Sequence, residues 1–496
     1  MTTLEKKVII KVLDEVNCVI IGLDPKDNKW MVDKYSPYAE NYRFSKKYKL
    51  GQWDGRISFY SKGGKTYNNL LEEMLPIIKR WGYKISLMDN RETFTLDIPV
   101  IDENYLETVG ITLGDHQVKG VNAITQDNGG IILAGTGAGK SIMCAALSKL
   151  YNDVCGLKVI MIVPTSDLVS QGVEDFKDLD IDVGEYSGDV KDINHPIIIS
   201  TWQALQNNPE MMGMFQVAIV DECHGVTGQI LKEILNNYGS HLYVKIGVTG
   251  TLPEPDVDRM SVRVTLGDVK FTVTSKQLIE NGWLAQLMIY MLELVEDYKP
   301  EYAIWQIEFP EESKGKSYND FLEVLFPEYD IEKRRLNKNE RRLNYVKKLV
   351  MEKRAKDKGN TLILVNSVEV GQKLAELIEG SYFVYSKDKK AFRRSVYKLF
   401  KDHDDVVAIA TSQLAATGLN IPRIFYLFFL DLGKSYIRTI QAIGRGLRKA
   451  PDKDFIEVID ISSNLKYSRI HQRKRVEHYK KHEYPFSKQK IEYTKN

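Results

Sequence analysis

The sequence predicts an α/β fold with two parallel-sheet lobes, a small N-terminal α+β domain and a short basic C-terminal extension. The first supporting observation is that short β-branched runs alternate with helical patterns over two long stretches, which is typical of parallel sheets. The second is length, because 496 residues at about 100–200 residues per domain accommodate several compact units. The third is composition, since 43% apolar and 27% charged residues are ordinary values for globular proteins.

The two stretches define the expected domain organisation. Residues 106–290 form the first expected lobe and residues 346–460 the second, separated by a connecting helical region at 291–345. We expect residues 1–105 to be an accessory nucleic-acid-binding domain and residues 461–496 to be the basic extension. The runs read as strands are short and continuously apolar, as buried parallel strands are. They lie at 131–134, 157–163, 196–200, 215–220 and 243–248 in the first lobe, and at 361–365, 381–385, 406–411, 424–430 and 455–461 in the second.

Charge is distributed unevenly along the chain. The net charge of +2 combines +4 over residues 1–100, +7 over residues 461–496 and −9 over the residues between. Basic ends suit a polyanionic partner, and solvated, flexible termini explain them equally well.

Several classes of protein are disfavoured. No run reaches the roughly 18 apolar residues that span a bilayer, so we expect a soluble cytoplasmic protein with no membrane partner. The four cysteines are scattered without a CxxC pair, which argues against disulfides and a structural zinc site.

A phosphate-binding loop follows the expected strand at 131–134. Its glycines allow consecutive backbone N–H groups to surround phosphate oxygens at the N-terminus of the next helix. Lys140 would reach the β- and γ-phosphates of ATP, and Ser141 would bind Mg²⁺. The alternative is a glycine-rich turn with an incidental lysine, which the strand, loop and helix context disfavours. The predicted nucleotide-binding residues are Gly135, Thr136, Gly137, Ala138, Gly139, Lys140 and Ser141.

Two adjacent carboxylates follow the apolar run at 215–220, at the strand end where open α/β sheets bind ligands. We expect Asp221 to hold Mg²⁺ and Glu222 to orient and deprotonate the water that attacks the γ-phosphate. An acidic pair beyond a strand is more often a solvated loop, but the preceding phosphate-binding loop favours catalysis. A metal role for Cys223 and His224 is disfavoured, because adjacent side chains project differently and no partner ligands are in view.

Three polar side chains of the second lobe have the spacing of one helix face. Gln441, Arg445 and Arg448 lie at i, i+4 and i+7. Arginine suits planar phosphate recognition, and γ-phosphate transfer can take its positive charge from a second domain. We therefore expect these residues to complete the catalytic site. The alternative is the solvated basic end of a helix.

These motifs, in this order along residues 110–460, resemble those of the superfamily 2 DExH helicases. The phosphate-binding loop has the AxxGxGK[ST] form of that superfamily, beginning at Ala134. The resemblance implies RecA-like lobes, ATP and Mg²⁺ as cofactors, and movement along DNA. It is nearest to the recombination helicases of bacteriophages, in the branch with XPB-like and restriction-type translocases. This implies action on junctions, forks and R-loops in recombination, repair and replication.

The resemblance also assigns roles to individual residues. Gln117 is implied to read the adenine base, within a motif that departs from the family pattern at Asp115 and His116. The implied contacts to the nucleic-acid backbone are Thr165, Thr201 and Thr411, the last belonging to a motif that continues over 416–422. The implied residues that couple the ATP state to strand movement are His224, Thr249, Gly250 and Thr251.

Basic and aromatic residues alternate between positions 42 and 62. This mixture suits base stacking combined with phosphate attraction. The alternative is a β-hairpin with a turn at Asp54-Gly55 whose aromatic rings belong to the core. Nucleic-acid binding and a structural hairpin are compatible if the aromatic rings point inward and the basic side chains point outward. The predicted DNA contacts are Arg43, Lys46, Lys47 and Lys49.

The sequence therefore predicts an ATP-dependent DNA helicase or translocase that acts on branched DNA. The alternatives are a duplex translocase that does not separate strands, an RNA helicase, and a non-motor ATP switch, which would not require arginines in a second lobe. The expected partners are branched, duplex and single-stranded DNA, RNA in RNA–DNA hybrids, and recombination or single-strand-binding proteins.

Overall fold

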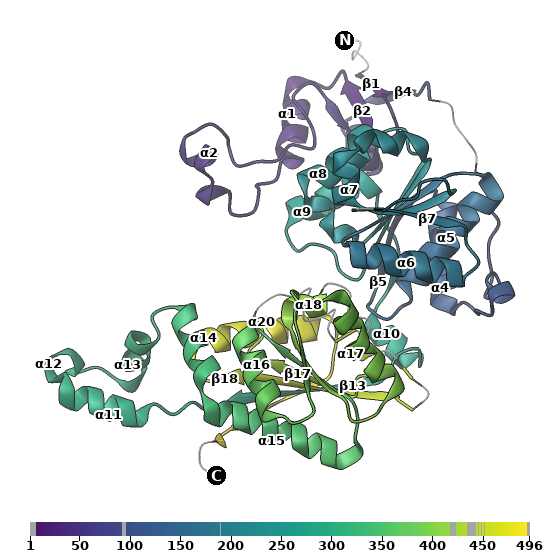
Figure 1. Cartoon of the computed structure of the whole chain (residues 1–496). Coiled ribbons are helices and arrows are strands. Elements are labelled where there is room, and N and C mark those ends of the chain that lie inside the picture. The colour runs from purple at the N-terminus through teal and green to yellow at the C-terminus, as the bar shows by residue number, and fades with distance from the viewer. Residues whose placement is uncertain are drawn as a thin grey trace. The chain divides into compact units, whose positions relative to one another are not determined.

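The computed structural model divides into two compact units, Met1–Val273 and Thr274–Asn496, which we describe separately (Figure 1). The structure describes residues 6–91, 96–188, 190–416, 423–433, 443–444, 446–447, 449–450 and 452–493. Within these residues, no helix has the length and apolar character needed to cross a membrane.

Residues 6–91 form a small α+β domain around a sheet of order β3-β2-β1-β4. Buried and exposed residues alternate along β1, so Val8 and Ile10 face the core. The core also includes Val257 and Val264 of α9 (Asp256–Leu266) in the first lobe. The domain elements are β1 (Lys7–Val12), β2 (Asn17–Ile21), α1 (Pro25–Lys34), η1 (Tyr42–Phe44), α2 (Lys46–Lys49), β3 (Lys65–Tyr67), η2 (Asn68–Leu70), α3 (Leu71–Arg80) and β4 (Lys84–Met88).

The small domain and the first lobe belong to one compact unit, whereas the sequence suggested an independent domain at 1–105. Arg263 of α9 donates to Glu73 of α3 at 2.6 Å, and Asn69 donates to the carbonyl of Val264 at 3.2 Å. The core of the small domain therefore continues into the first lobe through Val257 and Val264 of α9.

The first lobe is an eight-stranded sheet of order β12-β5-β11-β10-β6-β9-β7-β8. Its pairings are parallel except between β7 and β8. The five expected strands correspond to β5, β6, β9, β10 and β11. The lobe elements are η3 (Glu107–Val109), α4 (Asp115–Gln126), β5 (Gly130–Ala134), α5 (Lys140–Cys155), β6 (Val159–Val163), α6 (Ser166–Asp178), β7 (Val183–Ser187), β8 (Val190–Lys191), β9 (Ile197–Thr201), α7 (Trp202–Asn207), η4 (Pro209–Met214), β10 (Val217–Asp221), η5 (Cys223–Thr227), α8 (Gln229–Glu233), η6 (Ile234–Tyr238), β11 (Val244–Thr249), α9 (Asp256–Leu266) and β12 (Val269–Val273).

The second lobe is a parallel sheet of order β15-β16-β14-β17-β18-β13-β19. The five expected strands correspond to β14–β18, and the α/β class with two parallel-sheet lobes is confirmed. The lobe elements are α10 (Ser275–Glu280), β13 (Gln286–Leu294), α11 (Lys299–Glu308), α12 (Pro310–Ser313), α13 (Tyr318–Leu325), α14 (Tyr329–Lys338), α15 (Glu340–Asp357), β14 (Thr361–Val365), α16 (Val368–Leu377), β15 (Tyr382–Val384), α17 (Lys390–Asp402), β16 (Val407–Thr411), α18 (Ser412–Ala416), β17 (Tyr426–Leu430), β18 (Phe455–Ser463), α20 (Lys466–Lys481) and β19 (Phe486–Ile491).

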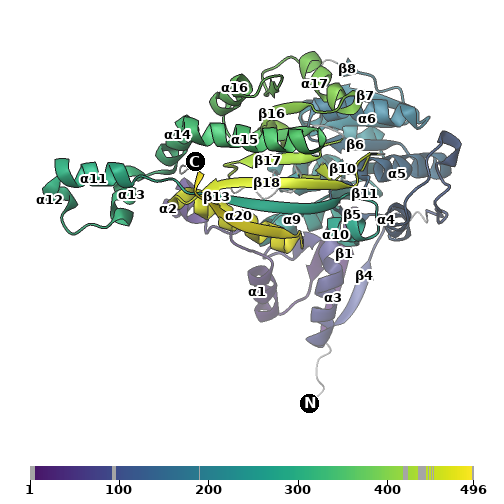
Figure 2. The ribbon, with the colours of Figure 1, turned by 90° about the horizontal axis from the view of Figure 1, so that it is seen from below.

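The boundaries of this lobe differ from those expected. β13 begins at Gln286, before the expected boundary at residue 290, and pairs with β18 and β19 of the second sheet. The expected extension at 461–496 is part of the same sheet, because β19 lies beside β13. Helices α11, α13 and α14 pack around their own apolar cluster with Leu465, and α11–α13 project from the lobe as an arm (Figures 1 and 2). The connecting region therefore belongs to the second lobe and includes this arm.

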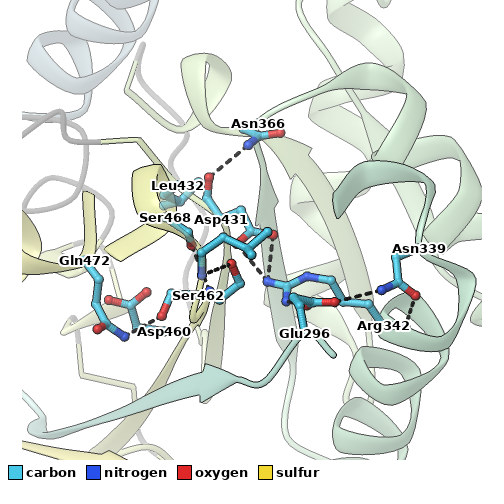
Figure 3. Close-up of polar contacts among 12 residues, drawn as sticks. Glu296, Asn339, Arg342, Asn366, Asp431, Leu432, Asp460, Ser462, Ser468 and Gln472 are labelled. Atoms are coloured by element: carbon cyan, nitrogen blue, oxygen red, sulfur yellow. Dashed lines mark hydrogen bonds and ion pairs between the residues drawn. The ribbon is translucent and has the colours of Figure 1, made fainter. Parts of the chain in front are cut away.

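A buried ion network lies at the carboxyl ends of the strands of the second lobe (Figure 3). Arg342 of α15, whose side chain is 1% exposed, donates to Glu296 at 2.7 Å and to both carboxylate oxygens of Asp431 at 2.7 and 2.8 Å. Glu296 also accepts from Asn339 and Tyr493. The network therefore ties α15 and the end of the chain to the loops that follow β13 and β17.

Arg342→Met should lower the local free energy of unfolding of the second lobe by about 3–5 kcal/mol, because it leaves two buried carboxylates without a counter-charge. Hydrogen–deuterium exchange of the β14 and β17 amides measures this loss. The matched control is Arg354→Met on the same helix, whose ion pair with Asp405 is partly exposed. The control should cost about 0–1 kcal/mol, and equal losses for the two variants would contradict the assignment of the buried network.

Candidate functional site

The phosphate-binding loop joins β5 to α5 through two glycines with left-handed backbone, Gly137 at φ 92° and Gly139 at φ 77°. The positive φ of Gly139 favours glycine at this position, and a Cβ atom there would also displace the Gln117 amide, whose Nε2 would lie 2.1 Å away. Lys140 is the first residue of α5, and its Nζ lies 3.6 Å from the position of a Cβ on Gly250. The loop therefore presents backbone N–H groups and the Lys140 amine at a helix N-terminus, which suits an anionic phosphate.

The adjacent carboxylates lie at the carboxyl end of β10. Asp221 is its last residue, and its Oδ1 accepts the backbone N–H of Glu222 at 2.9 Å. Glu222 adopts the left-handed region at φ 50°, which turns its side chain away from the strand direction. The Glu222 side chain is 22% exposed, so water can reach its carboxylate.

Glu222 is joined to two of the predicted coupling residues. Nδ1 of His224 lies 3.0 Å from Oγ1 of Thr249 and 3.3 Å from Oε2 of Glu222. Oγ1 of Thr249 also lies 3.3 Å from the same Glu222 oxygen and 2.9 Å from the carbonyl oxygen of Thr251. The structure therefore brings together Glu222, His224, Thr249 and Thr251, and Gly250 lies on the Lys140 side of the same cluster.

Electrostatics give the two carboxylates different protonation behaviour. Burial and the neighbouring Glu222 charge raise the pKa of Asp221 to about 6. Burial also acts to raise the pKa of Glu222, but Lys140 and the hydrogen bonds from His224 and Thr249 outweigh it and lower this pKa to about 2. Glu222 is therefore ionised at neutral pH and can accept a proton from a water molecule.

The donor set fits Mg²⁺ held together with a nucleotide. The described residues contain no cluster of three or more His, Cys, Asp or Glu side chains that could hold a metal alone. Ser141, exposed in the first turn of α5, and Asp221 at the end of β10 offer oxygen ligands. Mg²⁺ usually takes one or two protein oxygens and completes its shell with phosphate oxygens and water.

The predicted adenine reader contacts the phosphate-binding loop. Oε1 of Gln117 accepts from the backbone of Gly114 at 2.8 Å, and Nε2 of Gln117 donates to the carbonyl of Ala138 at 3.2 Å. Nε2 of His116 lies 3.0 Å from the same carbonyl, and burial lowers the pKa of this ring. No role was predicted for His116, although its position in the first turn of α4 beside Gln117 is a usable signal.

The threonines predicted to contact nucleic acid occupy helix and strand ends. Thr165 accepts from the backbone of Leu168 as the N-cap of α6, and Thr201 accepts from Ala204 as the N-cap of α7. Thr201 is 6% exposed, so its hydroxyl is the less accessible of the two. Thr411 ends β16. Helix capping alone explains the first two residues, and their contacts to nucleic acid stay predictions.

Other predicted residues of the second lobe lie outside the described residues. These are Gln441, Arg445 and Arg448, together with the part of the Thr411 motif at 417–422. Their proposed roles therefore rest on the sequence.

The predicted basic residues lie on an exposed loop over residues 38–56. Its base is closed by backbone hydrogen bonds from Ala39 to Gly55 at 2.8 Å and from Ile57 to Pro37 at 2.9 Å. The expected hairpin strands are absent from this described segment, which holds η1 and α2 and a single isolated antiparallel bridge between Tyr38 and Arg56. The exposed cations on η1 and α2 are Arg43, Lys46, Lys47 and Lys49.

The aromatic residues of this region divide between core and surface. Phe59 and Tyr60 are 1% and 0% exposed and belong to the core of the small domain. Phe44 is 75% exposed, while the rings of Tyr38 and Tyr42 stack at 4.6 Å between centroids. The interpretation of the rings as core is therefore correct for the end of the segment and wrong for its beginning.

Comparison with known proteins adds to this geometry. Residues 110–254 match the sequence family described as type III restriction enzyme, res subunit, and residues 341–450 match the helicase conserved C-terminal domain. The chain is 25% identical over 470 residues to the ATP-dependent DNA helicase uvsW of Enterobacteria phage T4, covering 88% of this chain and 89% of the relative. It is 22% identical over 473 residues to the DNA 3'-5' translocase XPB2 of Sulfurisphaera tokodaii, covering 89% and 99%.

Among solved structures, Dbp5 of S. cerevisiae bound to RNA and ADP BeF3 has a TM-score of 0.54 at 12% identity. The match covers 79% of this chain and 95% of that chain. At this identity the likeness concerns the fold, which agrees with two RecA-like lobes.

Glu222→Gln should retain ATP binding and lose turnover by about 10²–10⁴-fold, because it removes the base without removing a metal ligand. Fluorescent-nucleotide titration measures the first quantity and steady-state phosphate release the second. Glu233→Gln, the same chemical change at an exposed position on α8, is the matched control and should behave as the parent protein. Normal turnover by Glu222→Gln would show that Glu222 is not the base.

Proposed function

The chain belongs to the superfamily 2 helicases and is an ATP-driven helicase, and from this premise we propose that it remodels branched DNA. Its substrates would be junctions, forks and R-loops, which arise in recombination, repair and replication. The observation that supports a branched substrate is the exposed loop at 38–56. Its four cations form no ion pair within the described part of the chain, and Phe44 is 75% exposed beside them.

The chemistry assigned to the ATP site follows from its geometry. Lys140 and the loop amides would bind the phosphates, and Ser141 and Asp221 would hold Mg²⁺, which neutralises charge on the transferring phosphoryl group. Glu222 would take the proton of the attacking water, oriented by Thr249 and His224. Thr249 contacts Glu222 and begins the Thr249-Gly250-Thr251 motif. A change at the γ-phosphate that moves Glu222 would therefore also move this loop. Arg445 and Arg448 would supply further positive charge, with Gln441 beside them, and Gln117 would read the base.

Contacts with DNA are assigned to both units. Thr165, Thr201 and Thr411 would contact the backbone along the motor lobes, whereas the loop at 38–56 would contact a second arm of a branched substrate. Phosphate attraction by exposed cations is independent of ATP chemistry. The loop can therefore add affinity for branches without taking part in hydrolysis.

A duplex translocase that does not separate strands is the second candidate. It is favoured by the match of residues 110–254 to a restriction-enzyme subunit family and by the likeness to a translocase. Displacement of a labelled strand from a fork distinguishes the two candidates, because only a helicase releases the strand. The same strand-displacement assay tests two further alternatives. A partial RNA duplex tests for an RNA helicase, and a partial RNA–DNA duplex tests for action on hybrids.

Four-way junctions and forks should stimulate ATP hydrolysis at lower DNA concentration than single strands or linear duplex of equal length do. The physical reason is that the loop engages phosphates that only a branch places within its reach. Steady-state ATPase titrations with the four DNA structures measure the half-stimulating concentrations. Equal half-stimulating concentrations for all four DNA structures would contradict a preference for branched DNA. They would favour a translocase that does not distinguish these structures.

The variant with Arg43, Lys46, Lys47 and Lys49 all changed to Ala tests the loop itself. It should lose the preference for branches and lower the slope of log K against log salt by up to about 3–4, at roughly 0.9 per phosphate contact. Turnover at saturating DNA should be retained. The matched control changes four other exposed lysines of the same domain, Lys26, Lys29, Lys62 and Lys65. If the control variant lost the branch preference to the same extent, the preference would arise from the total positive charge of the domain and not from the loop.

A further inference from the structure

A groove of about 400 Å³ lies in the second lobe between α13 of the arm and the first half of α20. It is far along the chain from the phosphate-binding loop, and none of the predicted ATP-site or DNA-contact residues lines it. Leu322 and Phe326 line it from the arm side, and Leu465 and Ile470 from the α20 side. Ile470 is 43% exposed, although large apolar side chains usually avoid water.

The two walls of the groove are fixed to each other. Glu332 of α14 accepts the backbone N–H groups of Tyr467 at 2.9 Å and Ser468 at 2.7 Å, at the N-terminus of α20. The hydroxyl of Tyr467 donates to the carbonyl of Pro327 at 2.9 Å. Leu465 belongs to the apolar cluster of the arm. The walls of the groove are therefore held in place before any ligand binds. Binding would not carry the entropy cost of ordering them.

The α20 side of the groove is cationic. Its charged residues are Lys466, Arg469 and Arg473, against Glu323 on the arm side. Lys466 lies 3.3 Å from Glu323 in an exposed pair, and Arg469 lies 3.2 Å from Glu293. Arg473 forms no ion pair among the residues that the structure describes. The groove thus combines an apolar floor with a surplus of positive charge, which suits an anionic ligand with apolar groups.

Two features disfavour a nucleic-acid strand. Single strands bind by stacking their bases on accessible aromatic rings, and Phe326, the aromatic residue of the lining, is 2% exposed. The arm also carries eight acidic against three basic residues over 297–328, which repels a phosphate backbone. A short peptide that fills only the groove avoids most of this acidic surface.

We propose that this groove docks an acidic peptide segment with large apolar side chains, supplied by a partner protein. The apolar side chains would fill the space over Leu465 and Ile470, and the acidic side chains would pair with Arg469 and Arg473. Such a contact would connect the motor to another protein without occupying its ATP site. The area is small, so the affinity for a single peptide is in the micromolar range and depends on charge.

The probe is a fluorescein-labelled synthetic peptide that alternates Asp with Leu and Phe, titrated with the whole chain and followed by fluorescence anisotropy. Two matched peptides replace either Leu and Phe with Ser, or Asp with Lys. We expect saturable binding of the first peptide and at least about tenfold weaker binding of the other two, because each lacks one of the two interactions. Failure of the first peptide to bind, or equal binding of all three, would overturn the proposal.

Variants locate the binding site. Arg469→Glu combined with Arg473→Glu, and separately Ile470→Asp, should each weaken the peptide at least about tenfold. Both leave ATP hydrolysis unchanged, and thermal unfolding checks that the lobe is folded. The control, Lys480→Glu, reverses one charge at an exposed position of α20 outside the groove lining and should bind normally. Unchanged peptide binding by the groove variants, or displacement of the peptide by a short oligothymidylate, would contradict a peptide site.

Discussion

The site at the end of β10 depends on holding two adjacent carboxylates within the protein while giving them different pKa values. Asp221 and Glu222 repel each other, and the Lys140 amine and the His224 ring offset that repulsion mainly at Glu222. The sheet order makes this arrangement available. β10 lies beside β11, which carries Thr249 at its end, and β11 lies beside β5, which leads into the phosphate-binding loop. Parallel pairing therefore brings three sequence motifs to one edge of the sheet.

In the second lobe, the carboxyl ends of the strands hold a structural ion network. The carboxyl ends of β13 and β17 lead to Glu296 and Asp431, and both are held by the buried Arg342. Arg475 of α20 forms a second buried pair with Asp460 of β18 and donates to the carbonyl of Leu432. These contacts fix α15, α20 and the base of the arm on one rigid sheet. The groove between α13 and α20 lies beside these pairs, and its walls are held by the contacts of Glu332 and Tyr467.

The sequence predicted the parallel strands well, because such strands depend on local patterns, whereas the roles of the ATP-site residues stay predictions. Buried runs such as Val159–Val163 are recognisable alone, and the motif around Lys140 specifies its own strand, loop and helix. The sequence did not place β13 in the second sheet, because a strand that crosses an expected boundary is identified only by its long-range pairing. It also missed that the small domain shares its core with α9, and that the segment at 42–56 is a loop. Such features depend on contacts between distant residues.

We infer that Lys140 holds the phosphates of the nucleotide whose hydrolysis drives the motor. ATP turnover of Lys140→Ala at saturating DNA tests it most directly, with Lys149→Ala on the same helix as the control, since Lys149 is paired with Asp153. We expect Lys140→Ala to lose hydrolysis and strand displacement while it keeps salt-sensitive DNA binding, and Lys149→Ala to behave as the parent protein. DNA-stimulated turnover at the parent rate in Lys140→Ala would show that Lys140 does not hold these phosphates.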